Sequence, residues 1–187
     1  MWYAVQVETG REDASRDLIE QAARAAGLEG AFEELFVPKR RTLSKRSGEL
    51  VEGEEPLFPG YLIAVAKPRD AEGVAAALRR APRFARLLAY DGVFTPLAAD
   101  EVAWICAFAR REGPRRVVDM SEGHVEGGRV VVTSGPLVGR EGLIRKIDRR
   151  KRTAYLRLRI CGREVETKVG LSLVKKEKER ERRPRRD

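Results

Sequence analysis

The chain has 187 residues and a formal net charge of +9, with 38 lysines and arginines against 29 aspartates and glutamates. No apolar stretch approaches the about 20 residues that a transmembrane helix needs, and the first eight residues lack the pattern of a signal peptide. Apolar residues make up 42% of the chain, enough for a packed core in one domain or two small ones. The two cysteines lie far apart without metal-ligand spacing, which argues against structural zinc and a disulfide framework.

The charge is unevenly distributed along the chain. Residues 1–118 hold 18 basic and 18 acidic side chains, whereas residues 119–187 hold 20 basic and 11 acidic ones. We therefore expect a boundary near residue 118 between two electrostatically different parts. The basic part indicates a polyanionic partner, most often nucleic acid, although a merely soluble basic protein has the same composition.

The first elements are a strand and a helix. Residues 2–8 alternate and are rich in strand-forming side chains. Thr9 and Glu12 fit a capping box, which predicts that a helix begins here. Gly27 is suited to end that helix in the left-handed conformation.

A basic segment then returns as an acidic one. A strand over 32–37 continues into the basic residues 39–46, a turn follows at 47–48, and residues 49–55 are mostly acidic. One interpretation is a finger that binds nucleic acid. We favour a hairpin whose opposite charges pair across its two strands.

The rest of the N-terminal part alternates strands and helices. We expect an apolar strand over 58–65, a helix over 70–81, a strand over 84–90 and a helix from 95 to about 112. Cys106 falls on the apolar face of the last helix and is expected in the core. The order predicts an α+β domain over 1–112, with helices packed against one antiparallel sheet.

The C-terminal part consists of short strands. Residues 113–127, which include His124 as an expected surface residue, are predicted to be a linker. Close turn signals over 128–175 predict a small β-barrel. Its expected strands are 129–133, 142–147, 153–160, 163–169 and 171–174. Residues 176–187 alternate charges without core-forming residues and are predicted to be a disordered basic tail.

The hairpin that turns at residues 161–162 specifies its own register. With Ile160 opposite Arg163, alternation pairs Leu158 with Val165, Leu156 with Thr167, Arg159 with Glu164, Arg157 with Glu166 and Tyr155 with Lys168. Two arginines thereby gain cross-strand carboxylate partners, each pair worth a few tenths to ~1 kcal/mol. Lys168 is left without one.

A cluster of cations without matching acids marks the candidate binding site. Four consecutive cations form one turn, with Asp148 as the sole acid nearby. Their mutual repulsion is relieved most simply by a bound polyanion. The predicted RNA-binding residues are Arg145, Lys146, Arg149, Arg150, Lys151, Arg152 and Lys168.

Enzyme signatures are missing from the sequence. It contains no GxxxxGK[ST] phosphate loop and no GxSxG nucleophile elbow. The carboxylates of the 39–55 hairpin stand among basic residues, not in an apolar pocket. We therefore expect a protein that is not an enzyme and that uses no metal or cofactor.

Two sequence motifs resemble the NusG family of transcription elongation factors. WYAVQV at 2–7, GRE at 10–12 and FPGYL at 58–62 resemble its N-terminal (NGN) domain, and residues 128–142 resemble its C-terminal KOW domain. RLL at 86–88, FTPL at 94–97 and IDRRKR at 147–152 are similar to the LoaP-type members, which are operon-specific processive antiterminators.

The resemblance implies a mechanism and its contact residues. The NGN domain would bind the β′ clamp helices of RNA polymerase through Tyr3, Phe58, Pro59, Gly60, Tyr61 and Leu62. Upstream or non-template DNA would approach Lys39, Arg40 and Arg41. The KOW barrel would bind an RNA hairpin in the transcript leader. The protein would act in the cytoplasm as a monomer, without a membrane.

Two alternatives stay open. One is a general NusG, whose barrel couples polymerase to Rho or to the ribosome. That role needs exposed apolar residues more than a cationic turn. The other is a ribosome-associated KOW protein that binds RNA without any role at the polymerase, and FPGYL at 58–62 argues against it.

Overall fold

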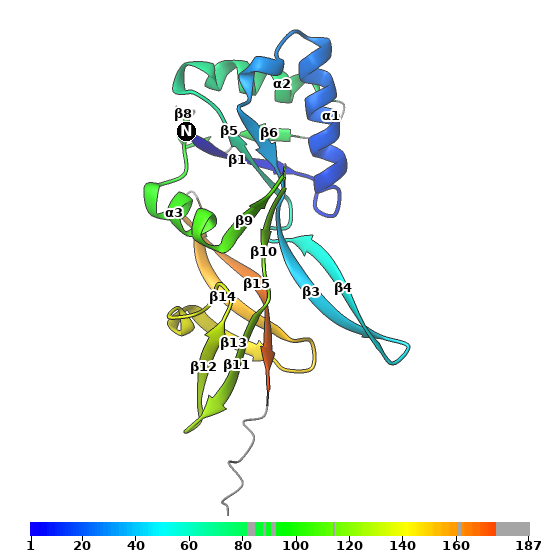
Figure 1. Cartoon of the computed structure of the whole chain (residues 1–187). Coiled ribbons are helices and arrows are strands. Elements are labelled where there is room, and N and C mark those ends of the chain that lie inside the picture. The colour runs from blue at the N-terminus through cyan, green and yellow to red at the C-terminus, as the bar shows by residue number, and fades with distance from the viewer. Residues whose placement is uncertain (82–84, 88, 91–92, 114, 161, 175–187) are drawn as a thin grey trace, which may run out of the picture.

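The chain forms an N-terminal half of helices and sheets above a curved C-terminal sheet, and a long hairpin stands out from the side (Figure 1). The computed structural model describes residues 1–174 except 82–84, 88, 91–92, 114 and 161. The predicted tail at 176–187 lies outside these residues. None of the described helices has the length and hydropathy that a membrane span requires.

A four-stranded sheet organises the N-terminal half, in the order β2-β5-β1-β6. Its strands are β1 (Trp2–Val7), β2 (Glu34–Phe36), β5 (Tyr61–Val65) and β6 (Ala85–Leu87). Helices α1 (Glu12–Ala25) and α2 (Ala71–Arg80) pack on it, and 3-10 turns lie at η1 (Glu29–Ala31) and η2 (Pro68–Asp70). Buried Val5, Ile19 and Val74 show that both helices cover one face of the sheet. The predicted α+β organisation is confirmed.

The start of α1 differs from the predicted capping box, while its end agrees. Thr9 makes no side-chain cap; the helix begins at Glu12 behind Arg11. The buried Glu12 carboxylate instead accepts hydrogen bonds from the N–H groups of Gly10 (3.0 Å) and Gly60 (2.7 Å). It therefore joins the start of α1 to the turn before β5. Gly27 follows the helix at φ 66°, in the left-handed conformation expected of it.

The protruding hairpin consists of β3 (Pro38–Arg46) and β4 (Glu49–Pro56). Its register places Arg40 opposite Glu55 and Arg41 opposite Glu54, which confirms the cross-strand pairing of opposite charges. A second sheet continues from it in the order β4-β3-β10-β9, with β9 (Ala109–Glu112) and β10 (Arg115–Val118).

Helix α3 (Ala99–Phe108) is shorter than predicted at both ends. The Glu101 carboxylate accepts the Ala98 N–H at 2.9 Å, so the helix begins after Ala98 instead of at Thr95. It ends at Phe108 because the next residues form β9 and pair with β10. The expectation that Cys106 is buried is wrong: its side chain is exposed. Strands β7 (Ala89–Tyr90) and β8 (Val93–Phe94) precede the helix.

The C-terminal sheet has five strands in the order β12-β11-β15-β14-β13. They are β11 (Ser121–Glu126), β12 (Arg129–Ser134), β13 (Ile144–Asp148), β14 (Thr153–Ile160) and β15 (Arg163–Leu173), with the 3-10 turn η3 (Glu141–Leu143) before β13. Every predicted pair between 153 and 168 is confirmed by the observed register. The predicted ion pairs Arg159–Glu164 and Arg157–Glu166 are wrong. Among the described residues the ion pair is diagonal, from Arg157 to Glu164 at 3.8 Å. The two strands predicted over 163–174 are one strand.

The predicted linker at 113–127 is mostly strand. It contains β10, which pairs in parallel with β3, and β11, which pairs with β12 and β15. His124 lies half-buried in β11, with its Nε2 3.5 Å from the Glu126 carboxylate. The C-terminal sheet therefore begins at Ser121, not at residue 128. The parallel partner of β10, β3, lies about 80 residues earlier in the chain, so local sequence signals do not reveal this pairing.

One apolar core joins the two halves. It contains Phe58 and Phe108 from the N-terminal half together with Leu156 from the C-terminal sheet. Polar contacts cross the same boundary: the Thr167 hydroxyl donates to the Leu57 carbonyl. The Arg140 guanidinium lies 5.1 Å from the centre of the Phe108 ring. The two halves are thus packed as a single body.

Candidate nucleic-acid interface

The seven predicted RNA-binding cations lie on the C-terminal sheet, on β13, on β15 and on the turn between β13 and β14. Six of them are exposed and Arg152 is half-buried. Within the described part of the chain, none of the seven forms an ion pair with a carboxylate. Their charge is therefore available to a ligand.

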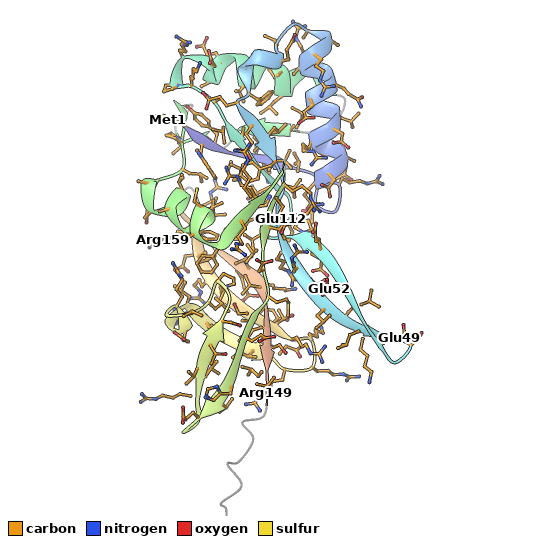
Figure 2. The ribbon with its side chains drawn as sticks, viewed as in Figure 1. Met1, Glu49, Glu52, Glu112, Arg149 and Arg159 are labelled. Atoms are coloured by element: carbon orange, nitrogen blue, oxygen red, sulfur yellow. The ribbon has the colours of Figure 1, made fainter. Side chains whose placement is uncertain are left out.

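The turn between β13 and β14 is stabilised by a hydrogen bond within the turn. The Asp148 carboxylate accepts the Lys151 N–H at 2.9 Å, and Arg152 adopts φ 48°. The Asp148 carboxylate thus stabilises the backbone of the turn, while Arg149, Arg150 and Lys151 extend into solvent. Figure 2 shows Arg149 at the end of the sheet far from the N-terminal half, and Arg159 at the level of α3. Arg149 and Arg159 therefore lie at different ends of the same sheet.

An aromatic side chain stands between two of these lysines. Lys146, Tyr155 and Lys168 are register neighbours on β13, β14 and β15. Both lysine Nζ atoms lie 5.5 Å from the centre of the half-buried Tyr155 ring. Aromatic rings flanked by cations are typical of sheet surfaces that bind single-stranded nucleic acid. The sequence indicated the Tyr155–Lys168 pairing but not the place of Lys146.

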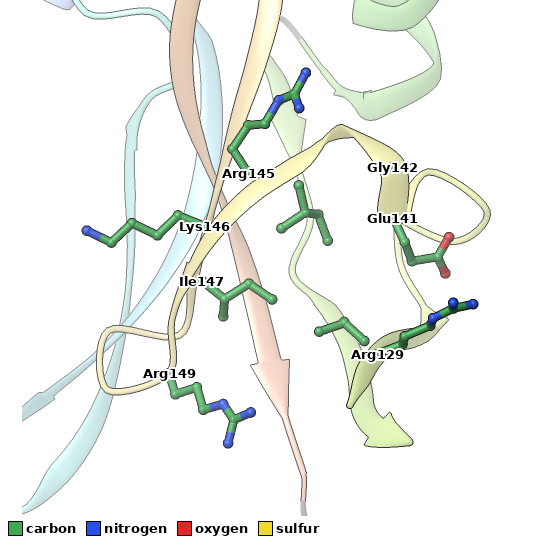
Figure 3. Close-up of a pocket in the computed structure, with 9 residues that line it drawn as sticks. Arg129, Glu141, Gly142, Arg145, Lys146, Ile147 and Arg149 are labelled. Carbon is green, nitrogen blue, oxygen red and sulfur yellow. The ribbon is translucent and has the colours of Figure 1, made fainter. Parts of the chain in front are cut away.

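A cavity of about 560 Å³ opens beside the turn. Its walls come from β12, η3 and β13, and Arg149 closes one side (Figure 3). Glu141 is the acid among the lining residues, and its carboxylate accepts the Val132 N–H at 3.2 Å. Hydrogen bonds from its own N–H and from those of Val132 and Gly139 hold the pKa of Glu141 below its usual value. The remaining charged residues of the lining are cations.

The cations predicted to contact DNA are engaged inside the chain. The pairs are Lys39 with Asp13 at 3.0 Å, buried Arg40 with Glu55, and Arg41 with Asp119 at 2.9 Å and with Glu112 at 2.5 Å. Burial lowers the pKa of Arg40, and Glu55 opposes that shift. The pairing of β10 with β3 brings Glu112 and Asp119 to Arg41. These ion pairs thus tie β3 to α1, to β4 and to the residues around β9 and β10. The sequence predicted the pairing with β4 but not the partners Asp13, Glu112 and Asp119.

The residues predicted to bind polymerase are mostly core. Tyr3, Phe58, Gly60 and Leu62 are buried, Tyr61 is half-buried and Pro59 is exposed. Gly60 has φ 82°, and a Cβ there would lie 2.8 Å from the Thr9 hydroxyl, so the turn requires glycine.

Sequence reasoning missed the aromatic partners of Phe58. Its ring centre lies 5.5 Å from that of Trp104, which lies 5.6 Å from that of Phe108, both edge-to-face. The four-residue spacing of Trp104 and Phe108 on a helix was the available signal. Trp104 is partly buried and lies between the two buried rings, so it covers this part of the core.

Comparisons with known proteins agree with the fold. The family model described as transcription termination factor nusG matches residues 1–106. The transcription termination/antitermination protein NusG of Thermus thermophilus is 27% identical over 179 residues, which is 94% of this chain and 97% of that protein. The protein of the same name from Pseudomonas aeruginosa is 27% identical over 182 residues, with the same coverage. A solved structure titled "Domain interaction in Thermotoga maritima NusG" has a similar fold, with a TM-score of 0.54, 22% identity and coverage of 91% of this chain and 92% of that one.

Proposed function

Because the chain belongs to the NusG family of transcription termination and antitermination factors, we propose that it is an operon-specific processive antiterminator of the LoaP type. The N-terminal half binds RNA polymerase at the β′ clamp helices. The C-terminal sheet, which we interpret as a KOW barrel, binds an RNA hairpin in the transcript leader. Members of the family are transcription factors and not enzymes.

The observation that carries this proposal is the contrast between two sets of cations. Lys39, Arg40 and Arg41 each meet a carboxylate of the same chain. The seven cations around β13 meet none among the described residues. Phosphates of a nucleic acid supply the missing negative charges, and counterion release makes such contacts favourable. Tyr155 adds an aromatic group that duplex DNA does not need but unpaired RNA bases use.

Polymerase binding places a condition on the N-terminal half. Phe58 is buried under Trp104 in the core shared with the C-terminal sheet. Docking that uses Phe58 therefore requires the core between the halves to open, whereas Pro59 and Tyr61 are accessible without that change. We place the first contact with polymerase at Pro59 and Tyr61. DNA is left out of the proposed contacts, because the cations predicted for it are already paired.

A pair of charge-matched variants tests RNA binding. Replacing Arg149, Arg150 and Lys151 with alanine removes three exposed cations from the turn, and replacing Arg157, Arg159 and Arg163 removes three from the opposite end of the sheet. RNA crosslinked to the full chain in cells is sequenced, and the affinity for the enriched hairpin is measured over a range of KCl concentrations. We expect one enriched leader hairpin and at least a tenfold loss of affinity with the turn variant alone.

The salt dependence supplies the decisive quantity. Each lost phosphate contact lowers the slope of log affinity against log salt by roughly 0.7 to 0.9, so the turn variant should lose about 2. The variant at Arg157, Arg159 and Arg163 should keep the wild-type slope. An unchanged slope in the turn variant, or an equal loss of slope in both variants, would show that the turn does not contact the RNA.

Polymerase binding is tested at Tyr61. Tyr61→Ala should strongly reduce the RNA polymerase that co-purifies with the full chain, while the melting temperature falls by only a few degrees because the side chain is half-buried. Leu50→Ala, at an exposed apolar position of the hairpin, serves as the control and should retain polymerase. Retention of polymerase by Tyr61→Ala would contradict the docking assignment.

A general NusG role is the second candidate. Val131 and Val138 are exposed on the C-terminal half, at 36% and 45% of their surface, and exposed apolar residues are what a protein partner such as Rho or a ribosomal protein would use. Val138→Asp separates the two functions. It should abolish capture of Rho or of ribosomes if the general role holds, and should leave RNA binding unchanged.

A further inference from the structure

The cavity on the C-terminal sheet lies at a seam between its two edge strands. In the order β12-β11-β15-β14-β13, the edges are β12 and β13. No ladder joins these two strands among the residues that the structure describes. Figure 3 shows Arg129 and Glu141 on one side of the cavity, and Ile147 pointing into it from the other. Among the described residues, the sheet is therefore not closed between β12 and β13.

The cavity combines an apolar floor with a cationic rim. Half-buried Val130, Ile144 and Ile147 supply the floor. The exposed side chains of Arg129 and Arg149 stand on two sides of the cavity (Figure 3). Such a surface suits a ligand with one flat, weakly polar part and one anionic part.

A β-bulge exposes two successive cations of β13. The register of β13 against β14 shifts between Ile144 and Lys146. Strict alternation would place Arg145 and Lys146 on opposite faces, one of them inward, whereas both are exposed here. Figure 3 shows Ile147 directed into the cavity, and Arg145 and Lys146 directed away from it. Lys146 thereby reaches the Tyr155 ring.

Size and charge together identify the class of ligand. A volume of about 560 Å³ falls in the range of sites for small molecules, roughly 300–1,000 Å³. Sequence-specific RNA binding uses unpaired bases that leave the stack. We propose that the seam binds one unpaired RNA nucleotide, with its base on Val130, Ile144 and Ile147 and its phosphate between Arg129 and Arg149. This inference rests on the proposed function. It adds that the RNA is recognised through a bulged or looped-out nucleotide next to the stem, because Arg149 belongs to both the turn and the seam.

The test compares RNA probes that differ in one nucleotide. Fluorescein-labelled hairpins share one stem, which is uninterrupted, carries a single bulged nucleotide with each base in turn, or carries a bulged abasic nucleotide. Fluorescence anisotropy with the full chain gives each affinity. We expect the best bulged base to bind about tenfold more tightly than the uninterrupted stem, which is the size of one base contact. The abasic bulge should lose that gain.

Two kinds of variant locate the preference in the seam. Gly142 lines the cavity, and a Cβ there meets no atom within 4 Å, so Gly142→Leu narrows the cavity without a backbone clash. Gly30→Leu is the matched control, at a glycine that is equally open but lies in η1. Ile147→Ala removes part of the floor. Gly142→Leu and Ile147→Ala should reduce the tenfold preference to less than threefold while leaving the affinity for the uninterrupted stem unchanged, and Gly30→Leu should keep it.

Three results would overturn the inference. They are equal affinity for bulged and uninterrupted stems, a preference that the abasic bulge retains, and a preference that both seam variants retain. A labelled Asp- and Glu-rich peptide is run in parallel, because an open edge strand can also pair with a peptide. If Gly142→Leu abolishes peptide binding and leaves RNA binding unchanged, the seam belongs to a protein partner. Stem binding that depends on Arg149–Lys151 but ignores the bulge refutes the seam alone, whereas loss of that dependence refutes the proposed function.

Discussion

Replacement of Phe108 with alanine should destabilise the whole chain, because this side chain links the two halves. It is 2% exposed, its ring centre lies 5.6 Å from that of Trp104, and the Arg140 guanidinium lies 5.1 Å from its centre. Removal of a buried phenylalanine ring costs about 3–5 kcal/mol through lost burial and the cavity left behind. For a chain of this size, each kcal/mol corresponds to roughly 2–4 °C in melting temperature. We therefore expect Phe108→Ala to melt about 6–20 °C below the wild type.

Urea unfolding followed by two probes tests this expectation. The first probe is tryptophan fluorescence. It reports on the N-terminal half, because Trp2 and Trp104 both lie there, and Trp104 borders the contact with the C-terminal sheet. Far-UV circular dichroism reports on both halves. The wild type should show coincident transitions, since one core joins the halves. In Phe108→Ala the transitions should separate, because the C-terminal sheet loses part of its packing partner.

A variant inside the N-terminal half provides the control. Val74 is fully buried between α2 and the first sheet, in a cluster that excludes the C-terminal sheet. Val74→Ala should lower the midpoint for both probes without separating them. The reasoning is refuted if Phe108→Ala costs less than about 1 kcal/mol, well below the expected range. It is also refuted if Val74→Ala separates the two probes as widely as Phe108→Ala does.

Two further predictions concern the C-terminal sheet. A Cβ on Gly123 would lie 2.3 Å from the Val131 carbonyl oxygen, so Gly123→Ala should cost at least about 1–3 kcal/mol in urea unfolding, whereas Gly142→Ala, with no atom within 4 Å, should change little. Backbone N–H groups lower the pKa of Glu141 in the folded chain, so the stability that its carboxylate adds is present above its unfolded pKa and is lost as pH falls through the folded one. Glu141→Gln should therefore have a lower urea midpoint than the wild type at neutral pH, and the difference should shrink steadily as the pH falls through the folded pKa of Glu141. A difference that does not change with pH would contradict the hydrogen-bonded carboxylate.

Local chemistry predicted the elements whose partners lie nearby in the chain. The register between residues 153 and 168 follows from alternation and a tight turn, and each predicted pair was observed. The charge pairing of β3 with β4 and the end of α1 at Gly27 were predicted on the same basis. The unmatched cations at 145–152 were also visible in sequence, because their lack of acidic neighbours is a local property.

Distant pairing accounts for the predictions that failed. The segment 113–127 was expected to be a linker because two of its partners, β3 and β15, are far away in the chain. Helix α3 ends at Phe108 because the residues that follow form β9, which pairs with β10, the strand that also pairs with β3. The pairing of β10 with β3 also brings Glu112 and Asp119 to Arg41, in addition to the cross-strand partner Glu54, a pairing of opposite charges that the sequence predicted.

The sequence by itself determined that the excess charge of +9 belongs to residues 119–187, and that it concentrates where no acid is close. It determined which strands alternate and which turns join them, since both depend on neighbouring residues. Only the tertiary structure decided which cations remain free, because an ion pair requires two groups to meet in space. Only the tertiary structure placed Phe58 in a core shared by both halves and opened a cavity between β12 and β13. Burial and cavities arise from the packing of distant segments, which no single segment encodes.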